Sequence, residues 1–517
     1  MNSRSRFVLG FILVCLIALA LRLPQLAQRP MHTDEAVHAI KFGQLLEDNY
    51  YHYNPFEYHG PTLNYFTLIP AWLSGADTLP DVTEITLRSV PLFSGLLLIL
   101  VLLFLQNGLS RSIILVAALL TAISPAFVFF SRYYIQEMLL VFFTFTAIVS
   151  GYRYIKEPKI SWAISTGIFI GLMHATKETC VIAWFALGAA MVIYAIFSKV
   201  SFHHMRSAFR WTHVTAALGS AVIISVIFFS SFFTYPRGIV DSILTFTTYL
   251  QRGTGGFQTH LYPFSYYFKW LIEAGEWPVL IVALFGIWAI FGSKKMQADF
   301  PFLRFIALYT IILTIIYSLI PYKTPWSMLG FYHGFVLLAA VGIVFLLKVT
   351  NKKYFRILMS LVILTGLART GYAAYKLNYP EKADPYNPYV YAHTDEDFYR
   401  LVNAVKELAA VHPHGKKVFI EVVCPEGDYW PLPWYLRDFP NVGYWSAVDM
   451  EAPAAPIIIA KPSVTDQLMK KLYAVPPPGE RNLYIPFFRK GVFLRAGVEL
   501  DLFVVKKYYD KWRRQEK

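Results

Sequence analysis

The sequence has little charge and almost no cysteine. Charged residues make up 15% of the 517 residues, against roughly 25% in soluble domains, whereas hydrophobic residues make up 56%. Its three cysteines stand far apart, Cys15 and Cys180 in apolar runs and Cys424 in the polar tail, so no disulfide framework and no CxxC metal site is present. Internal repeats and low-complexity tracts are also lacking. The composition is that of an integral membrane protein.

The positive charge does not form a nucleic-acid surface. The net charge is +14, but lysine and arginine fall in short clusters between apolar runs and not on one face. Basic loops between membrane spans mark the cytoplasmic side. The sequence therefore predicts no nucleic-acid partner, and the basic excess indicates membrane topology.

Eleven apolar runs are long enough to cross a hydrocarbon core of roughly 30 Å. They cover residues 7–21, 89–106, 112–130, 138–154, 162–175, 180–198, 213–233, 277–292, 304–320, 327–347 and 355–375. The first resembles a signal peptide, because Arg4 and Arg6 precede it. The sequence RLPQLAQRP follows it instead of a small-residue cleavage site, so we expect an uncleaved span.

The loops predict an orientation in the cell membrane. With a cytoplasmic amino terminus the basic loops lie inside, and a first loop (22–87), a second loop (234–276) and the tail (376–517) lie outside. The tail alternates strand-like runs, KVFIEVV and APIIIA, with helix-like runs, among them a basic terminal helix, DLFVVKKYYDKWRRQ. The predicted fold is an all-α polytopic membrane module (1–375) of about 11 transmembrane helices, with a small extracytoplasmic α/β domain (376–517).

Two adjacent acids follow the first span, in MHTDEAVHA. Neighbouring residues on a helix diverge by about 100°, so Asp34 and Glu35 cannot both face the same way. One is then available for catalysis while the other is structural. The alternative is an interfacial helix, AVHAIKFGQLLED, capped by Thr33 or Asp34, with Glu35 complementing the helix dipole.

The same loop is rich in histidine, which raises a metal hypothesis. A zincin motif is absent, because Asp34 stands where HExxH needs its first histidine. An oxygen-rich divalent cation suits these side chains as well as zinc does. The potential ligands are His32, Asp34, Glu35, His38, His52 and His59.

Charges also occupy three short outer turns. SRYYIQE carries Arg132 and Glu137, TKE carries Lys177 and Glu178, and PYKTPW carries Lys323. Each could be a side chain that reaches from a helix end to the interface. Their joint placement with Asp34 and Glu35 instead indicates one site, because cations stabilise a departing phosphate and a carboxylate accepts the proton of an attacking hydroxyl. This chemistry is sugar transfer from a lipid phosphate.

These motifs resemble the GT-C superfamily of membrane glycosyltransferases. HTDEAVH, EYHGPTLNYF, RYYIQE and GLMHATKET are similar to the branch that includes protein O-mannosyltransferases and the lipid A aminoarabinose transferase, over residues 1–330. PYKTPW, PYNPYVYAHT and DYWPLPWYLRDFPNVGYW are similar to an uncharacterised prokaryotic branch sometimes labelled flippase-activity-associated.

The resemblance implies a reaction and roles for residues. A sugar passes with inversion from a polyprenyl-phosphate donor to an extracytoplasmic protein, lipid or glycan, with no tightly bound metal. Asp34 is the implied general base beside Glu35, and Glu137 takes a second acidic position at which many relatives have Asp. The implied donor-phosphate ligands are Arg132, Lys177 and Lys323. The expected substrate-binding residues are His59, Tyr133, Glu178, Tyr322 and Trp326.

Two alternatives stay open. The chain could be a lipid-linked-sugar flippase or accessory component without catalysis. In the tail, WPLPWYLRD could form a glycan-binding platform or a buried core helix that begins at a proline. The platform residues would be Trp430, Trp434, Tyr435, Arg437 and Asp438.

Overall fold

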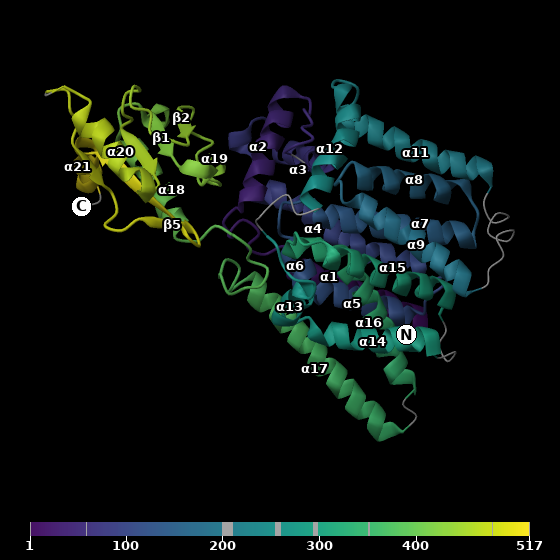
Figure 1. The fold of residues 1–517 in the computed structure, drawn as a ribbon. Helices are drawn as coiled ribbons and strands as arrows, with labels where there is room; N and C mark the ends of the chain where they lie inside the picture. Colours follow the sequence, from purple (N-terminus) through teal and green to yellow (C-terminus); the bar gives the residue numbers. More distant parts are fainter. Residues whose placement is uncertain are drawn as a thin grey trace.

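The computed structural model describes residues 2–57, 59–198, 210–253, 260–292, 298–349, 352–477 and 479–515, without the side chains of 248–253. A bundle of long helices fills most of the molecule, and a sheet-containing domain lies at one end of it, beside α2 and α3 (Figure 1). The amino terminus lies toward the opposite end of the bundle (Figure 1).

Within the described ranges, eight helical segments are long and apolar enough to span a membrane. They are α1 (Ser3–Ala20), α4 with η2 (Glu84–Leu105), α7 (Glu137–Lys156), α9 (Cys180–Phe197), α11 (Trp211–Phe229), α15 (Phe300–Leu319), η3 with α16 (Pro325–Val349) and α17 (Lys353–Asn378). A ninth is a pair bent by 118°, α13 (Tyr266–Glu273) and α14 (Trp277–Gly292). The remaining two predicted spans are shorter helices, α5 (Arg111–Ile123) and α8 (Ile160–His174).

The predicted span 112–130 is broken because Pro125 cannot continue a helix. Ser124 ends α5, and its side chain caps α6 (Pro125–Phe130). The Glu276 carboxylate, at the bend between α13 and α14, accepts hydrogen bonds from the Ser124 hydroxyl (2.6 Å) and the Ala126 amide (3.0 Å). Two helix breaks therefore meet inside the bundle and satisfy each other's polar groups.

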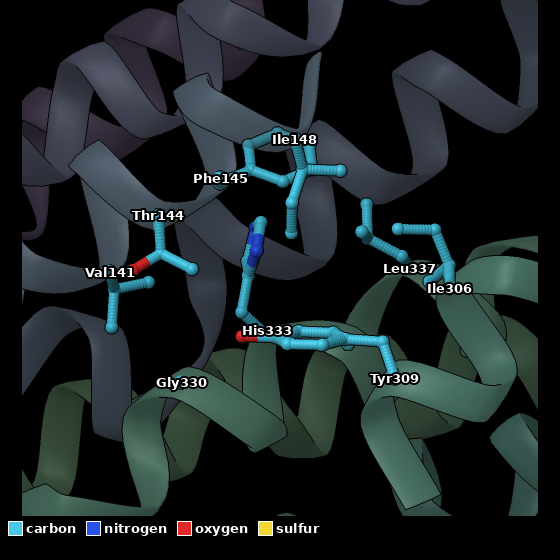
Figure 2. A pocket seen from close by; sticks show the side chains of 10 residues that line it. Val141, Thr144, Phe145, Ile148, Ile306, Tyr309, Gly330, His333 and Leu337 are labelled. Carbon is cyan, nitrogen blue, oxygen red and sulfur yellow. The ribbon is translucent and has the colours of Figure 1, made fainter. Parts of the chain in front are cut away.

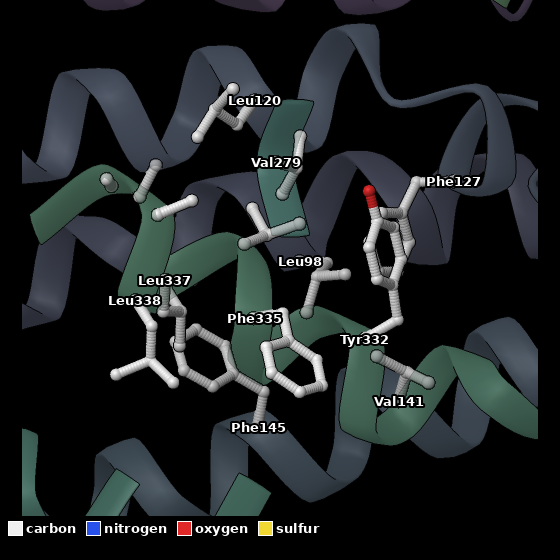
Figure 3. Close-up of a cluster of buried hydrophobic side chains, with 14 of the residues drawn as sticks. Leu98, Leu120, Phe127, Val141, Phe145, Val279, Tyr332, Phe335, Leu337 and Leu338 are labelled. Carbon is white, nitrogen blue, oxygen red and sulfur yellow. The ribbon is translucent and has the colours of Figure 1, made fainter. Parts of the chain in front are cut away.

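The bundle core is packed around α16, most of which is buried. Figure 3 shows Leu337, Leu338 and Phe335 of α16 among side chains from neighbouring helices. Tyr332 stacks on Phe127 of α6 at 5.8 Å between ring centroids. A Cβ at Gly286 of α14 would lie 1.9 Å from the carbonyl oxygen of Leu338, so only glycine allows this approach of α14 to α16.

The predicted first loop (22–87) forms α2 (Thr33–Asp48), α3 (Thr62–Ser74) and η1 (Leu79–Asp81), and the predicted second loop (234–276) contains α12 (Arg237–Gly253). The helix predicted over AVHAIKFGQLLED is confirmed as α2, but its predicted cap was wrong. His32 is the N-cap: its Nδ1 accepts from the Asp34 amide (3.0 Å), while Glu35 accepts from the His32 amide (3.1 Å). The side chain of Asp34 is left out of the cap.

After α17 the chain forms an α/β domain with a six-stranded sheet in the order β2-β1-β3-β6-β4, in which β5 also pairs with β6. The strands are β1 (Ile420–Val423), β2 (Val442–Trp445), β3 (Ile457–Ala460), β4 (Tyr484–Pro486), β5 (Val492–Arg495) and β6 (Val498–Val505). The helices are α18 (Phe398–Val411), α19 (Leu432–Tyr435), α20 (Thr465–Met469) and α21 (Lys506–Gln515), with η4 (Gly415–Lys417), η5 (Pro425–Gly427), η6 (Pro462–Val464) and η7 (Lys470–Ala474) between them. Strands β1, β2 and β3 are parallel, and β6 runs antiparallel to them. The predicted terminal helix was partly wrong, because its first residues, DLFVV, belong to β6.

The WPLPWYLRD segment docks this domain on the membrane module. Trp434 is buried and donates to the Glu84 carboxylate (2.8 Å), and Tyr435 accepts from the Met31 amide (2.8 Å). Arg437 lies over the Trp434 ring and donates to the Val82 carbonyl (2.9 Å). The platform interpretation was wrong for these three residues, because their faces and polar groups are used in the interface.

Candidate active site

Glu35 is a structural acid. It is fully buried and forms a bidentate pair with Arg88, with both distances 2.8 Å, and it also accepts from the Tyr134 amide (2.9 Å). Burial alone would raise the pKa of Glu35, but Arg88 and Arg29 outweigh it and hold the pKa below its ordinary value. The carboxylate therefore ties α2 to α4 and is not available to a substrate.

Asp34 is the accessible acid of the pair. Its side chain is 44% exposed, and among the described residues its one ionisable contact within ion-pair distance is the buried His32 ring at 3.9 Å. Burial lowers the pKa of three histidines, and the negative charge of Asp34 partly offsets this by raising it; they are His32, His38 and His260. Asp34 thus lies beside histidines of three segments and keeps a carboxylate open to substrate.

Glu137 and Lys177 form a buried ion pair between the start of α7 and the turn before α9. Burial would lower the pKa of Lys177, but the carboxylates of Glu137 and Glu178 raise it overall. Lys177 is therefore a permanent cation. Among the described residues, Lys177 is the only predicted phosphate ligand that is paired with a carboxylate, which an arriving phosphate could replace.

Glu178 lies on the other side of the same turn. It accepts from the Tyr53 hydroxyl (3.1 Å) and contacts His59 Nδ1 at 2.9 Å. Burial would raise the pKa of Glu178, but the His59 contact keeps it below its ordinary value. His38, next to His59 at 6.1 Å between ring centroids, has its pKa lowered to about 3 by burial, with His59 adding to the effect. His38 is therefore neutral and sits within range of the charges of both Asp34 and Lys177.

An aromatic cluster joins these two parts of the site. The His32 ring lies 5.4 Å from Tyr133 and 6.1 Å from Trp326, and its Nε2 donates to the Tyr391 carbonyl (3.0 Å). The rings of Tyr133 and His393 are 5.3 Å apart. Sequence reasoning missed Tyr391 and His393. The PYNPYVYAHT motif that holds them was noticed, but nothing in the sequence brings it to α2.

Arg132 and Lys323 do not face a substrate site in this structure. Arg132 donates to the carbonyls of Arg22 (2.9 Å), Pro24 (2.7 Å) and Gln25 (3.2 Å). Lys323 is buried and donates to the carbonyls of Ile320 and Tyr262. In this structure each cation fixes a loop, and the expectation that both hold phosphate stays a prediction. Tyr322 is half-buried, and its ring packs edge-on against His260 at 5.6 Å between centroids.

A narrow cavity runs from the ion pair into the bundle. Its outer part is lined by Glu137, Lys177 and Trp326 together with apolar residues of α7, α9, α15 and α16. The inner part shares Val141, Thr144, Tyr309 and Gly330 with it and ends among Ile148, Ile306 and Leu337. Figure 2 shows His333 standing between Thr144 and Phe145 on one side and Tyr309 on the other. This groove is charged at its mouth and mostly apolar in its depth, where Thr144, Tyr309 and His333 are the polar side chains.

The histidine-rich loop does not assemble a metal centre. Among the described residues, no group of three or more His, Cys, Asp or Glu side chains is placed to hold a metal ion. His32 caps α2, Glu35 pairs with Arg88, and His59 contacts Glu178.

Comparison with known proteins was made for sequence and structure. The family model for dolichyl-phosphate-mannose-protein mannosyltransferases matches residues 12–238, and no curated protein matches the sequence. ArnT from Cupriavidus metallidurans, solved with undecaprenyl phosphate, superposes with a TM-score of 0.65 over 98% of this chain and 99% of that chain, at 12% identity. This chain has the GT-C fold.

Other GT-C structures agree. The oligosaccharyltransferase of Archaeoglobus fulgidus, tethered to an acceptor peptide, aligns with a TM-score of 0.54 over 85% of this chain and 64% of that chain, at 14% identity. The mycobacterial arabinofuranosyltransferase AftD aligns with a TM-score of 0.50 over 98% of this chain and 40% of that chain, at 12% identity. The family match and the fold together confirm the resemblance inferred from the motifs, and they support a membrane glycosyltransferase.

Proposed function

We propose that this GT-C protein transfers a sugar from a polyprenyl-phosphate donor to an acceptor on the outer face of the cell membrane, with inversion. The observation that carries the proposal is the pairing of an accessible carboxylate, Asp34, with a cation, Lys177, at the mouth of an apolar groove. Trp326 connects the two, because it lines the groove and packs near His32.

The donor would enter with its phosphate at Lys177 and its isoprenoid chain in the groove. Binding of the phosphate replaces part of the Lys177–Glu137 contact, so the cation neutralises the charge that develops as the phosphate leaves. Glu137 then shares the cation and faces the sugar. The mostly apolar lining from Val141 to Leu337 suits a hydrocarbon chain, but the closed cavity is narrow, so the helices would have to part to admit that chain.

Asp34 would act as the general base. The acceptor heteroatom attacks the anomeric carbon, its proton passes to the Asp34 carboxylate, and the bond from the anomeric carbon to the phosphate oxygen breaks. Polyprenyl phosphate leaves with the bonding electrons. A single displacement of this kind inverts the anomeric centre.

The other acids and cations take positioning roles in this proposal. Glu35 orients the start of α2 through Arg88, Arg132 fixes the segment that precedes α2, and Lys323 holds the turn that carries Trp326. Glu178 and His59 shape the wall beside Lys177. Tyr133 and Tyr322 stay candidate substrate contacts, since the Asp34 charge acts on Tyr133 and on His260, whose ring packs against Tyr322.

The relatives support the substrate classes without naming the acceptor. ArnT was solved with undecaprenyl phosphate, and the Archaeoglobus fulgidus enzyme with a dolichol-phosphate and an inhibitory peptide. We propose the same donor class here. The N-terminus would then be cytoplasmic, with α2, α3 and the C-terminal domain outside.

The proposal is tested with Asp34→Asn in proteoliposomes that contain undecaprenyl-phosphate-linked sugars. Loss of the base should reduce sugar transfer by about 10²–10⁴-fold. Asp48→Asn, at the other end of α2, is the control and should keep full turnover. Full transfer by the Asp34 variant would remove Asp34 as the base, and movement of the donor across the bilayer without its consumption would favour a flippase.

A further inference from the structure

A strip of half-buried aromatic rings follows the carboxyl edge of the sheet in the C-terminal domain. Tyr429 stacks on Trp430 at 5.9 Å and contacts Tyr444 of β2 at 4.8 Å between centroids. None of the three is fully buried, unlike the neighbouring Trp434. The strip therefore presents ring surface that docking on the membrane module does not use.

A charged network borders the strip. Asp428 contacts Lys461 and Arg495, both at 2.5 Å, and all three side chains are between 17% and 22% exposed. This network places a hydrogen-bond acceptor, the Asp428 carboxylate, beside two donors, the Lys461 and Arg495 side chains. A ligand hydroxyl group can donate to the carboxylate and accept from either cation.

The strip and network lie where α/β sheets bind ligands. β1 has β2 on one side and β3 on the other, both parallel to it, so the chain connections diverge at β1. Asp428 follows β1 and Lys461 follows β3. The carboxyl edge at such a switch point is the usual ligand position in open α/β sheets.

The strip also begins next to Asp34. Arg495 Nη1 lies 3.4 Å from the Thr33 hydroxyl and 3.4 Å from the Trp430 carbonyl. Thr33 precedes Asp34 in the chain, so one guanidinium joins the start of the aromatic strip to the segment that carries the accessible acid. A ligand lying on the strip would have one end close to Asp34.

We propose that this strip is an acceptor subsite for a saccharide chain. Flat ring faces pack on the apolar faces of sugar rings, and the Asp428, Lys461 and Arg495 groups bond to sugar hydroxyls. A polypeptide acceptor would pair its backbone with a sheet edge or fill a series of side-chain pockets. The edge strand β2 is only four residues long, so it offers little backbone for such pairing. The inference rests on the proposed function for the identity of the ligand as an acceptor, but the binding itself does not require catalysis.

The experiment measures binding of mannotetraose, cellotetraose and chitotetraose to the full chain in nanodiscs by saturation-transfer NMR. At least one should bind, and Trp430→Ala should weaken that binding about tenfold. Tyr386→Ala is the matched control, because Tyr386 is a fully exposed aromatic outside the strip. Asp34→Asn should bind the saccharide normally while failing in transfer.

The outcomes separate the two proposals. Saccharide binding that depends on Trp430 in a protein without transfer supports the subsite and removes the proposed function. Where transfer is present, Trp430→Ala should raise the acceptor KM about tenfold and leave the donor KM unchanged. Three results would overturn the subsite. The first is that none of the three saccharides binds, and the second is that the Trp430→Ala and wild-type proteins bind them equally. The third is transfer only to a peptide, with an unchanged acceptor KM in the Trp430→Ala variant.

Discussion

At the residue scale, two adjacent acids differ in burial because neighbouring side chains on a helix point in different directions. Glu35 points into the protein and meets Arg88 of α4, whereas Asp34 points to the outside of the same helix turn. The sequence predicted that they would differ. It could not assign the roles, because Arg88 lies 53 residues away in the chain.

Removing the charge of each acid should therefore have different effects on stability. Glu35→Gln leaves the buried Arg88 and Arg29 cations without their counter-charge, and we expect a loss of about 3–5 kcal/mol. Asp34→Asn should change the free energy of unfolding by no more than about 0.5 kcal/mol. Thermal unfolding of both purified variants measures the difference, and equal stabilities would contradict the structural role of Glu35.

His38 gives a pH prediction. Histidine titrates near pH 6.5 in an unfolded chain, whereas burial, aided by His59, lowers the pKa of His38 to about 3 in the folded protein. Between these values the unfolded chain binds more protons, so stability falls as the pH falls through 6.5, by up to about 1.4 kcal/mol per pH unit.

The variant His38→Gln should remove this contribution. Its melting temperature should decline less steeply than that of the wild type between pH 6.5 and pH 5, with no difference in slope above pH 7.5. His32 and His393 shift in the same direction and keep part of the slope. Parallel curves for the two proteins would show that His38 is not buried as a neutral ring.

At the element scale, α7, α15 and α16 leave a narrow groove between them beside the glycines of α16, Gly330 and Gly334. Gly330 lies at the point shared by the outer and inner parts of the cavity. A Cβ there meets only Leu313 at an ordinary 3.6 Å, whereas a Cβ at Gly334 would lie 2.0 Å from Thr310 Oγ1. Gly330 can thus be enlarged without a backbone clash.

Gly330→Leu should fill the groove and raise the KM for a polyprenyl-phosphate sugar about tenfold. The matched control is Gly188→Leu in α9, where a Cβ has open space around it. Transfer kinetics with donors of different chain length measure the effect, which should be larger for long chains. An unchanged donor KM would place the lipid chain elsewhere.

At the scale of the whole molecule, the C-terminal domain and its linker complete the site. Thr394 donates to the Met31 carbonyl (2.7 Å), Tyr391 accepts from His32, and Tyr435 binds the Met31 amide. Each contact holds the segment just before Asp34. The linker and the domain therefore help to hold the segment that carries Asp34, the proposed base.

Ending the chain after Asn378 should abolish transfer although Asp34 and Lys177 are retained. A shorter truncation after Val505 removes only α21, which packs on α18 away from Asp34, and should keep activity. Transfer assays on both truncated proteins, after confirmation of folding by gel filtration, test this. An active bundle without its domain would mean that the contacts at Met31 are not needed.

The sequence by itself determined the helical bundle, the interfacial helix α2 and the presence of two acids after the first span, because these depend on composition and short-range periodicity. The tertiary structure decided which acid stays accessible, which cations fix loops and which one faces the groove, and that PYNPYVYAHT lies beside α2. The physical reason is that each of these choices is made by partners far apart in the chain, such as Arg88 for Glu35 and Glu137 for Lys177, and a local pattern carries no record of them.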